Sequence, residues 1–148
     1  MLPGQQDPAD PRVGDSAEKT QRKGAKRQGR LIAVRGDRAG ITGQGIVSGG
    51  GIPRTPAFKH HHRFACLEMC NHVRVDGVRF EQSPYWCLFA AQCRHLTIEN
   101  TKVVNSALGP RFVQGTDQYH FYNCEDVRVD RVFAMGSDDV VVVNAEGR

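Results

Sequence analysis

Hydrophobic and polar residues alternate in three separate stretches of this chain. The apolar positions of the three stretches are Val73, Val75 and Val78, then Leu96, Ile98 and Val103, then Val127, Val129 and Val132. A period of two, with β-branched residues at many of these positions, is typical of a strand that buries one face. No stretch keeps the 3.6-residue period of a helix over ten or more residues, so the sequence predicts an all-β protein.

Each of these stretches begins at a cysteine and is one copy of an eleven-residue repeat. The copies are CNHVRVDGVRF from Cys70, CRHLTIENTKV from Cys93 and CEDVRVDRVFA from Cys124, with a fainter copy, RAGITGQGIVS, from Arg38. Their starts lie 32, 23 and 31 residues apart. Repeats at such intervals are typical of a solenoid, in which each unit buries its apolar face against its neighbours.

A second predicted strand precedes each copy. The segments are LIAVRG (31–36), RFACLEM (63–69), WCLFAAQ (86–92) and DQYHFYN (117–123), and DDVVVVN (138–144) begins the next pass. When the copies are aligned on the cysteine, one column contains Leu31, Arg63, Trp86, Asp117 and, in the next pass, Asp138. Strand, short turn, strand and loop describe one coil of a parallel β-helix, with coils about 4.8 Å apart. We therefore predict a right-handed parallel β-helix of about four to five coils.

An antiparallel β-sandwich is the competing fold, because short strands joined by glycine-rich turns also suit it. Hairpin turns such as Asn-Gly would favour the sandwich, and none lies between the predicted strands. In the β-helix, Cys70, Cys93 and Cys124 would form a ladder of buried thiols at an interior corner.

The cysteines give little indication of a bound metal, and we expect neither a metal nor a cofactor. Their number is five, whereas a disulfide framework would need an even set. A zinc site formed by Cys66 and Cys70 with His72 or one of the histidines at 60–62 is an alternative, but no second pair has ligand spacing.

The net charge of the chain belongs to its N-terminal segment. Residues 1–38 contain nine Lys and Arg against five Asp and Glu, whereas residues 39–148 contain eleven of each. Residues 1–29 are polar and without apolar periodicity, so we predict a disordered tail followed by a β-helix domain over residues 30–148. The basic run has no interleaved aromatic residues, and we expect neither a nucleic-acid partner nor a membrane partner.

The two ends of the chain bear on its completeness and location. The chain stops at Arg148, partway through a predicted coil, and neither end supplies the capping element that a solenoid normally needs. We therefore expect a piece of a longer protein. We also expect it to be a monomer. No export signal follows Met1, so the compartment stays open.

Three carboxylates, Asp117, Asp138 and Asp139, form the candidate site. The predicted register places Asp117 and Asp138 in one column of adjacent coils, and crowding of like charges raises the pKa of at least one of them. A protonated carboxyl beside an ionised one is the equipment of glycoside hydrolysis. Solvated turns or calcium binding are the alternatives that the spacing leaves open.

The segment DQYHFYN combines apolar and polar side chains, which we expect to separate between the interior and the surface. Tyr119 and Phe121 are apolar and are expected to point inward. Asp117 and His120 are then expected to point outward, toward a cleft.

The order of several segments resembles the polygalacturonase family, family 28 of the glycoside hydrolases. These segments are ITGQGIVSGGG (41–51), CNHVRVDGVRFEQSPYWCL (70–88), CRHLTIENTKVVN (93–105), GTDQ (115–118), CEDVRV (124–129) and GSDD (136–139). The resemblance covers about residues 31–148 and implies a parallel β-helix that hydrolyses a polysaccharide of the pectin type.

The resemblance also implies roles for the three acids. Asp138 would be the general acid that protonates the glycosidic oxygen, while Asp117 and Asp139 would orient and deprotonate the attacking water. The family inverts the anomeric configuration by single displacement, with acid and base far enough apart to admit a water. His120 and Gln118 are expected to bind substrate beside them.

The chain departs from the family pattern at three positions. Gly115 and Gln118 replace the Asn and the final Gly of N-T-D-G, and Ser137 replaces the Gly of G-D-D. The later G-H-G and R-x-K motifs of the family have no counterpart here, so substrate choice stays open between polyuronates and neutral glucans. We expect little or no activity from these 148 residues alone. A non-catalytic, carbohydrate-binding or inactive β-helix is the alternative function.

Overall fold

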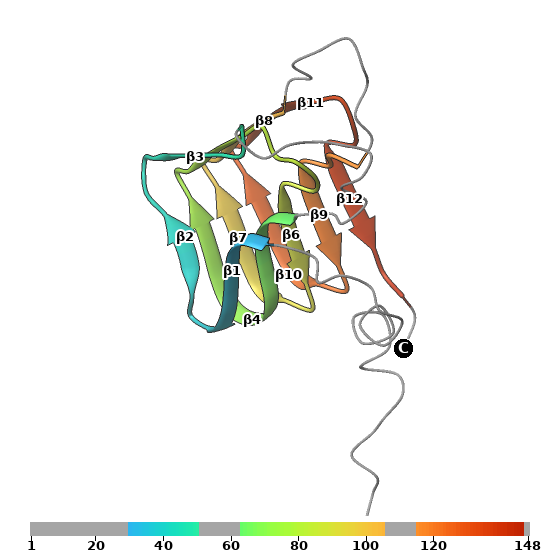
Figure 1. Cartoon of the computed structure of the whole chain (residues 1–148). Helices are drawn as coiled ribbons and strands as arrows, with labels where there is room; N and C mark the ends of the chain where they lie inside the picture. The colour runs from blue at the N-terminus through green and yellow to red at the C-terminus, as the bar shows by residue number, and fades with distance from the viewer. Residues whose placement is uncertain (1–29, 51–62, 106–114, 147–148) are drawn as a thin grey trace, which may run out of the picture.

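The structure is a computed structural model, and it describes residues 30–50, 63–105 and 115–146. All regular elements in these residues are β-strands (Figure 1). In chain order the strands are β1 (Arg30–Asp37), β2 (Gly40–Thr42), β3 (Ile46–Ser48), β4 (Arg63–Asp76), β5 (Arg79–Glu81), β6 (Leu88–Ala91), β7 (Arg94–Glu99), β8 (Lys102–Asn105), β9 (Tyr119–Tyr122), β10 (Glu125–Asp130), β11 (Phe133–Gly136) and β12 (Val141–Asn144). None of the described residues forms a helix that could cross a bilayer.

The strands wind into stacked coils. One ladder of parallel strands runs β1–β4–β6–β9–β12, a second runs β2–β4–β7–β10, and a third runs β3–β5–β8–β11. Strand β4 is long enough to serve both the first and the second ladder of its coil. The fold is thus a right-handed parallel β-helix with four coils and the first strand of a fifth, as predicted. The parallel pairing of every described ladder is incompatible with an antiparallel sandwich.

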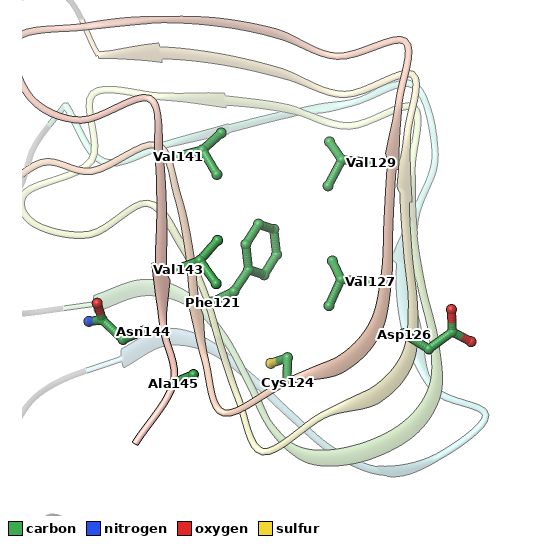
Figure 2. A pocket seen from close by; sticks show the side chains of 9 residues that line it. All are labelled: Phe121, Cys124, Asp126, Val127, Val129, Val141, Val143, Asn144 and Ala145. Atoms are coloured by element: carbon green, nitrogen blue, oxygen red, sulfur yellow. The ribbon is translucent and has the colours of Figure 1, made fainter. Parts of the chain in front are cut away.

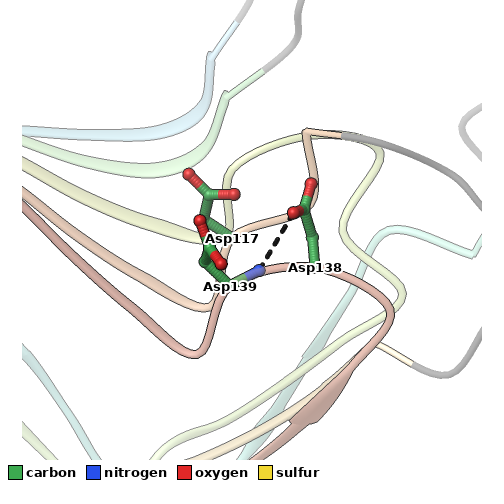
Figure 3. Close-up of side chains that lie close together, drawn as sticks. All are labelled: Asp117, Asp138 and Asp139. Carbon is green, nitrogen blue, oxygen red and sulfur yellow. Dashed lines mark hydrogen bonds between the residues drawn. The ribbon is translucent and has the colours of Figure 1, made fainter.

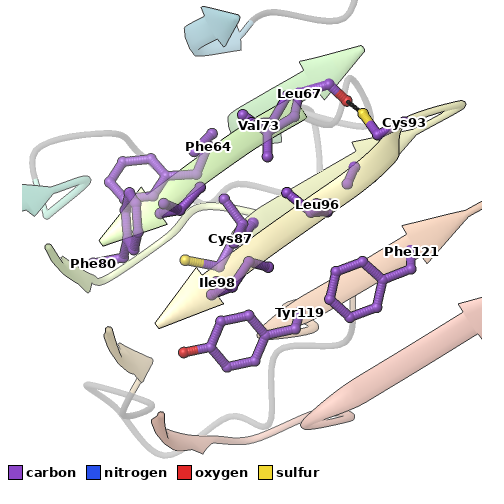
Figure 4. Close-up of a cluster of buried hydrophobic side chains, with 14 of the residues drawn as sticks. Phe64, Leu67, Val73, Phe80, Cys87, Cys93, Leu96, Ile98, Tyr119 and Phe121 are labelled. Carbon is purple, nitrogen blue, oxygen red and sulfur yellow. Dashed lines mark hydrogen bonds between the residues drawn. The ribbon is translucent and has the colours of Figure 1, made fainter. Parts of the chain in front are cut away.

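The core lies inside the coils and is built from the predicted alternating positions (Figure 4). Val73 pairs with Leu96 on the next coil and Val75 with Ile98, and all four side chains are buried. Burying each such side chain contributes about 1.5–3 kcal/mol relative to leaving it exposed. Val129 continues the second column on the fourth coil but remains 38% exposed, since no described strand stacks on it.

The cysteine ladder lies at the corner between the first two strands of each coil. The thiols of Cys70, Cys93 and Cys124 donate hydrogen bonds of 3.3–3.4 Å to backbone carbonyls of the preceding coil. The residue before each cysteine has a left-handed backbone with φ near 50°, and these residues are Met69, Gln92 and Asn123. All five cysteines are free thiols, as the odd count suggested.

The register corrects two members of the predicted column. A β-bulge between Val34 and Gly36 shifts the first coil, so Arg30, not Leu31, pairs with Arg63. At the other end, β12 pairs with β9 at an offset of 22 residues, which places Asp139, not Asp138, beside Asp117. The fifth pass contains no cysteine on which the copies could be aligned, and the sequence alignment was therefore wrong by one residue there.

An apolar hollow of about 350 Å³ lies at the last described coil (Figure 2). It opens on the interior of the β-helix, between β10 and β12. Its lining consists of Phe121, Cys124, Asp126, Val127, Val129, Val141, Val143, Asn144 and Ala145. The predicted tail at 1–29 and the histidines at 60–62 lie outside the described residues.

Candidate active site

The three carboxylates lie where two successive coils begin (Figure 3). Asp117 lies two residues before β9, and Asp138 and Asp139 belong to the four-residue connection between β11 and β12. One oxygen atom of each carboxylate lies within 4.8 Å of an oxygen of the other two. The parallel register thus brings together the three acids that the sequence singled out.

Backbone N–H groups hold the carboxylate of Asp138 in place. Its Oδ2 accepts hydrogen bonds from the amides of Gly115 and Thr116, the second at 3.1 Å. Its Oδ1 accepts a bond of 3.0 Å from the amide of Asp139 (Figure 3). The connection that carries Asp117 therefore also fixes the orientation of Asp138.

Asp117 is the most enclosed of the three acids. Its residue is 7% exposed, whereas Asp138 is half-buried and Asp139 is exposed. Burial raises the pKa of Asp117, and the negative charges of Asp138 and Asp139 raise it further, while a hydrogen bond from His120 opposes the shift. A carboxyl with a raised pKa beside two others is a candidate for proton transfer.

Aromatic rings border Asp117 on the preceding coil. Trp86 holds the register position next to Asp117, and its ring stacks on Tyr85 with centroids 4.8 Å apart. The guanidinium group of Arg63 lies 5.0 Å from the Trp86 ring centroid. Burial raises the pKa of the Tyr85 hydroxyl, and the charges of Asp117 and Asp138 add to this shift.

His120 is not open to a cleft, contrary to the expectation from the sequence. Tyr119 and Phe121 point into the core as predicted, and His120 projects from the other side of β9, but it is only 3% exposed. Its ring lies under those of Trp86 and Phe89, with centroids 4.2 and 5.4 Å away. This placement leaves the ring almost no surface for contact with a sugar.

Gln118, the second residue expected to bind substrate, is fully buried. Its Nε2 donates to the carbonyl of Thr116 at 2.8 Å, and its Oε1 accepts a bond of 2.9 Å from Asn105. Oδ1 of Asn105 in turn accepts the backbone amide of Ser83 at 2.8 Å. Gln118 therefore stabilises the connection before β9 from inside the coil. Its amide is not exposed to a substrate in the described part of the chain.

A comparison with known families decides the classification. The family model for glycosyl hydrolases family 28 matches residues 16–148, most of the chain. The chain belongs to glycosyl hydrolase family 28. No curated protein matches this family 28 chain. Among solved structures it is similar to a candidate glycosyl hydrolase from Parabacteroides merdae, with 15% identity, a TM-score of 0.46 and coverage of 79% of this chain and 67% of the other.

The departures of this family 28 protein from the N-T-D-G and G-D-D motifs have structural counterparts. The hydroxyl of Ser137 lies 3.4 Å from that of Thr116, so the extra side chain joins the two connections that carry the acids. Gly115 packs against Tyr85, whose ring leaves no room for a β-carbon at residue 115. Gln118 fills the interior beside Gly136. The motif changes thus leave the three acids together and alter the contacts around them.

Among the described residues, the acid cluster offers a metal ion three carboxylate ligands. It is the one group of three or more His, Cys, Asp or Glu side chains in the described residues with metal-like spacing. Calcium takes six to eight oxygen ligands. Oδ2 of Asp138 already accepts two N–H groups, which reduces its capacity to bind a cation.

Sequence reasoning missed Asn105 and Asn144, although both support the site. Asn144 Nδ2 lies 3.1 Å from Nε2 of His120. The sequence signal for Asn144 was its position as the one polar residue at the end of the run VVVVN. The period of two places Asn144 on the same face as Val142, and Val142 is the register partner of His120. Asn105 likewise closes the apolar pair of KVVN.

Proposed function

We propose that this family 28 protein hydrolyses glycosidic bonds in a polysaccharide, with a pectin-type polyuronate as substrate. The observation that carries the proposal is the convergence of Asp117, Asp138 and Asp139 at the start of adjacent coils, with their oxygens within 4.8 Å. Asp138 acts as the general acid, and Asp117 with Asp139 activates the water. The raised pKa of Asp117 suits a group that must take a proton from water.

The hydrogen bonds of Asp138 define which oxygen would carry the proton of the acid. Oδ2 accepts two backbone N–H groups, which occupy both of its lone pairs, whereas Oδ1 accepts the amide of Asp139. The transferable proton would therefore sit on Oδ1, which then faces the glycosidic oxygen. The backbone bonds keep this oxygen aimed while the proton leaves.

The deciding experiment compares Asp138→Asn with the native full-length protein in release of reducing ends from polygalacturonate. Loss of the general acid should lower the rate by roughly 10²–10⁴-fold. Asp37→Asn is the matched control, because Asp37 is an exposed acid at the end of β1 on the first coil. Native turnover by Asp138→Asn would contradict the proposed function.

We further propose that the reaction inverts the anomeric centre, as the family resemblance implies. Inverting enzymes separate their two carboxyl groups by roughly 6.5–9.5 Å, and retaining enzymes by roughly 5–5.5 Å. The distance of at most 4.8 Å in this structure is measured between one selected oxygen of each acid. It is not the separation of the carboxyl groups to which those two ranges refer. Proton NMR of the first-formed anomer decides the outcome, and a product with the configuration of the substrate would exclude inversion.

Carbohydrate binding without hydrolysis is the second candidate function. It is favoured by the stacked rings of Tyr85 and Trp86 beside Arg63, because aromatic faces and guanidinium groups both suit a polyuronate chain. Calorimetry with oligogalacturonates separates the two functions. Binding that is unaffected in Asp138→Asn, with no turnover by the native protein, would support this second function.

A further inference from the structure

The buried ring of His120 makes a hydrogen bond at each nitrogen. Its Nδ1 lies 2.8 Å from Oδ2 of Asp117, and its Nε2 lies 3.1 Å from Nδ2 of Asn144. An Asn side-chain nitrogen carries two N–H groups and no acceptor. Nε2 must therefore accept the bond from Asn144, and the single ring proton must be on Nδ1.

The surroundings of the ring leave it one orientation. His120 is the register partner of Phe89 on the preceding coil, and the two rings are in contact. Trp86 covers the imidazole with centroids 4.2 Å apart and planes tilted by 38°. Rotation of the ring by 180° would break the bonds to Asp117 and Asn144 at the same time. The packed rings thus aim Nδ1–H at Asp117.

We propose that His120 is a positioning residue for hydrolysis: as the neutral tautomer with its proton on Nδ1, it fixes the carboxylate of Asp117. The inference rests on the proposed function of the same three acids. Oδ2 of Asp117 accepts the bond from His120, and we assign Oδ1 to the attacking water. As the water oxygen bonds to the anomeric carbon, its proton passes to Oδ1, and the leaving glycosidic oxygen takes the proton of Asp138.

Two neutral substitutions test which ring nitrogen matters. The side-chain nitrogen of His120→Asn can occupy the place of Nδ1 and donate to Asp117. The longer amide of His120→Gln reaches toward Asn144 and lacks a donor at that place. We expect His120→Gln to lose roughly ten- to a hundredfold in kcat, as small misplacements of a reacting group do, with little change in KM, and His120→Asn to retain most of kcat.

Thermal unfolding of both variants controls for stability, since both lose the same aromatic contacts. Native kcat in His120→Gln, or equal losses of kcat in the two variants, would overturn the positioning role. Nitrogen-15 NMR of the native protein gives a readout without catalysis. A protonated Nδ1 and an unprotonated Nε2 near neutral pH are expected, and the opposite tautomer would overturn the inference. If the native protein shows no hydrolysis, the proposed function fails, whereas this NMR result still decides the tautomer and the pairing with Asp117.

Discussion

The side-chain amide of Gln118 occupies the space in which a β-carbon on Gly136 would lie. Gly136 ends β11, one residue before the connection that carries Asp138 and Asp139. Gln118 is fully buried and follows Asp117 directly. The absence of a side chain at residue 136 therefore lets the two acid-bearing connections pack together.

Gly136→Ala should destabilise the protein by about 1–3 kcal/mol, because the methyl group overlaps an amide that is held by two hydrogen bonds. Urea unfolding of both proteins measures the difference. Gly45→Ala is the control, since a β-carbon at that residue meets no atom within 4 Å. Equal stabilities of the two variants would show that the space beside Gln118 is not restrictive.

The buried hydroxyls of Tyr119 and Thr101 share a hydrogen bond of 3.0 Å between adjacent coils. Burial raises the pKa of Tyr119 to about 12. Tyr119→Phe leaves the Thr101 hydroxyl without this partner, which should cost about 1–3 kcal/mol. Thr101→Val should cost a similar amount, whereas the double variant should be more stable than the two single losses predict. Additive losses in this cycle, measured by chemical unfolding, would mean that the hydroxyls are not coupled.

The raised pKa of Asp117 predicts a pH dependence of stability. Because its pKa in the folded protein lies above that of the unfolded chain, the folded state binds more protons between the two values. Protonation of Asp117 contributes fully to the free energy of unfolding below the unfolded pKa of about 3.9. This contribution is lost as the pH rises through the folded pKa. Asp117→Asn should therefore gain stability relative to the native protein as the pH rises through this interval.

The pKa of Asp76 is shifted in the opposite direction to that of Asp117. A hydrogen bond from Asn100 and the charge and bond of Arg74 lower the pKa of Asp76. Its contribution to stability is thus present above the unfolded pKa and is lost as the pH falls through the folded value. Asp76→Asn should lose stability relative to the native protein as the pH rises. Unfolding titrations at several pH values check both slopes, and equal slopes for the two variants would contradict the assignment.

The cysteine ladder predicts one thiol that reacts before the others. Cys124 is partly exposed and lines the apolar hollow, and its interaction with the neighbouring Cys93 side chain lowers its pKa (Figure 2). Burial raises the pKa of Cys66 to about 11, and Cys87 is fully buried. Iodoacetamide should therefore modify Cys124 first at neutral pH, since the thiolate is the nucleophile. Peptide mass spectrometry identifies the labelled site, and Cys124→Ser should remove the fast phase; early labelling of Cys87 would count against the burial described.

The period-two pattern predicted the coils well because every coil meets the same physical demand. Val75, Ile98 and Val129 recur on one face since each must cover the residue on the coil below. Cysteine recurs at the corner because a small side chain with a weak donor can reach a carbonyl there. The register at the two ends was predicted less well, since neither the segment with the bulge after Val34 nor the one with β12 has the cysteine on which the copies were aligned.

The grouping of the three acids could be predicted from the register, but their surroundings could not. His120 lies on the outer face of β9, as predicted, and alternation does not tell what covers that face. Trp86 and Phe89 cover it because rings on adjacent coils lie close enough to stack. The inward turn of Gln118 likewise depends on reaching Asn105 from the neighbouring connection, a contact that local pattern does not encode.

The coils of this protein differ most in length at one of their three corners. The first two corners contain at most three residues each, whereas the third connection has fourteen residues after β3, six after β5, thirteen after β8 and four after β11. Asp117 and Asp138 both lie in such third connections. Insertions can therefore reshape the rim beside the acids and change which sugars are admitted, while the hydrogen-bonded scaffold that sets the spacing of the acids stays as it is.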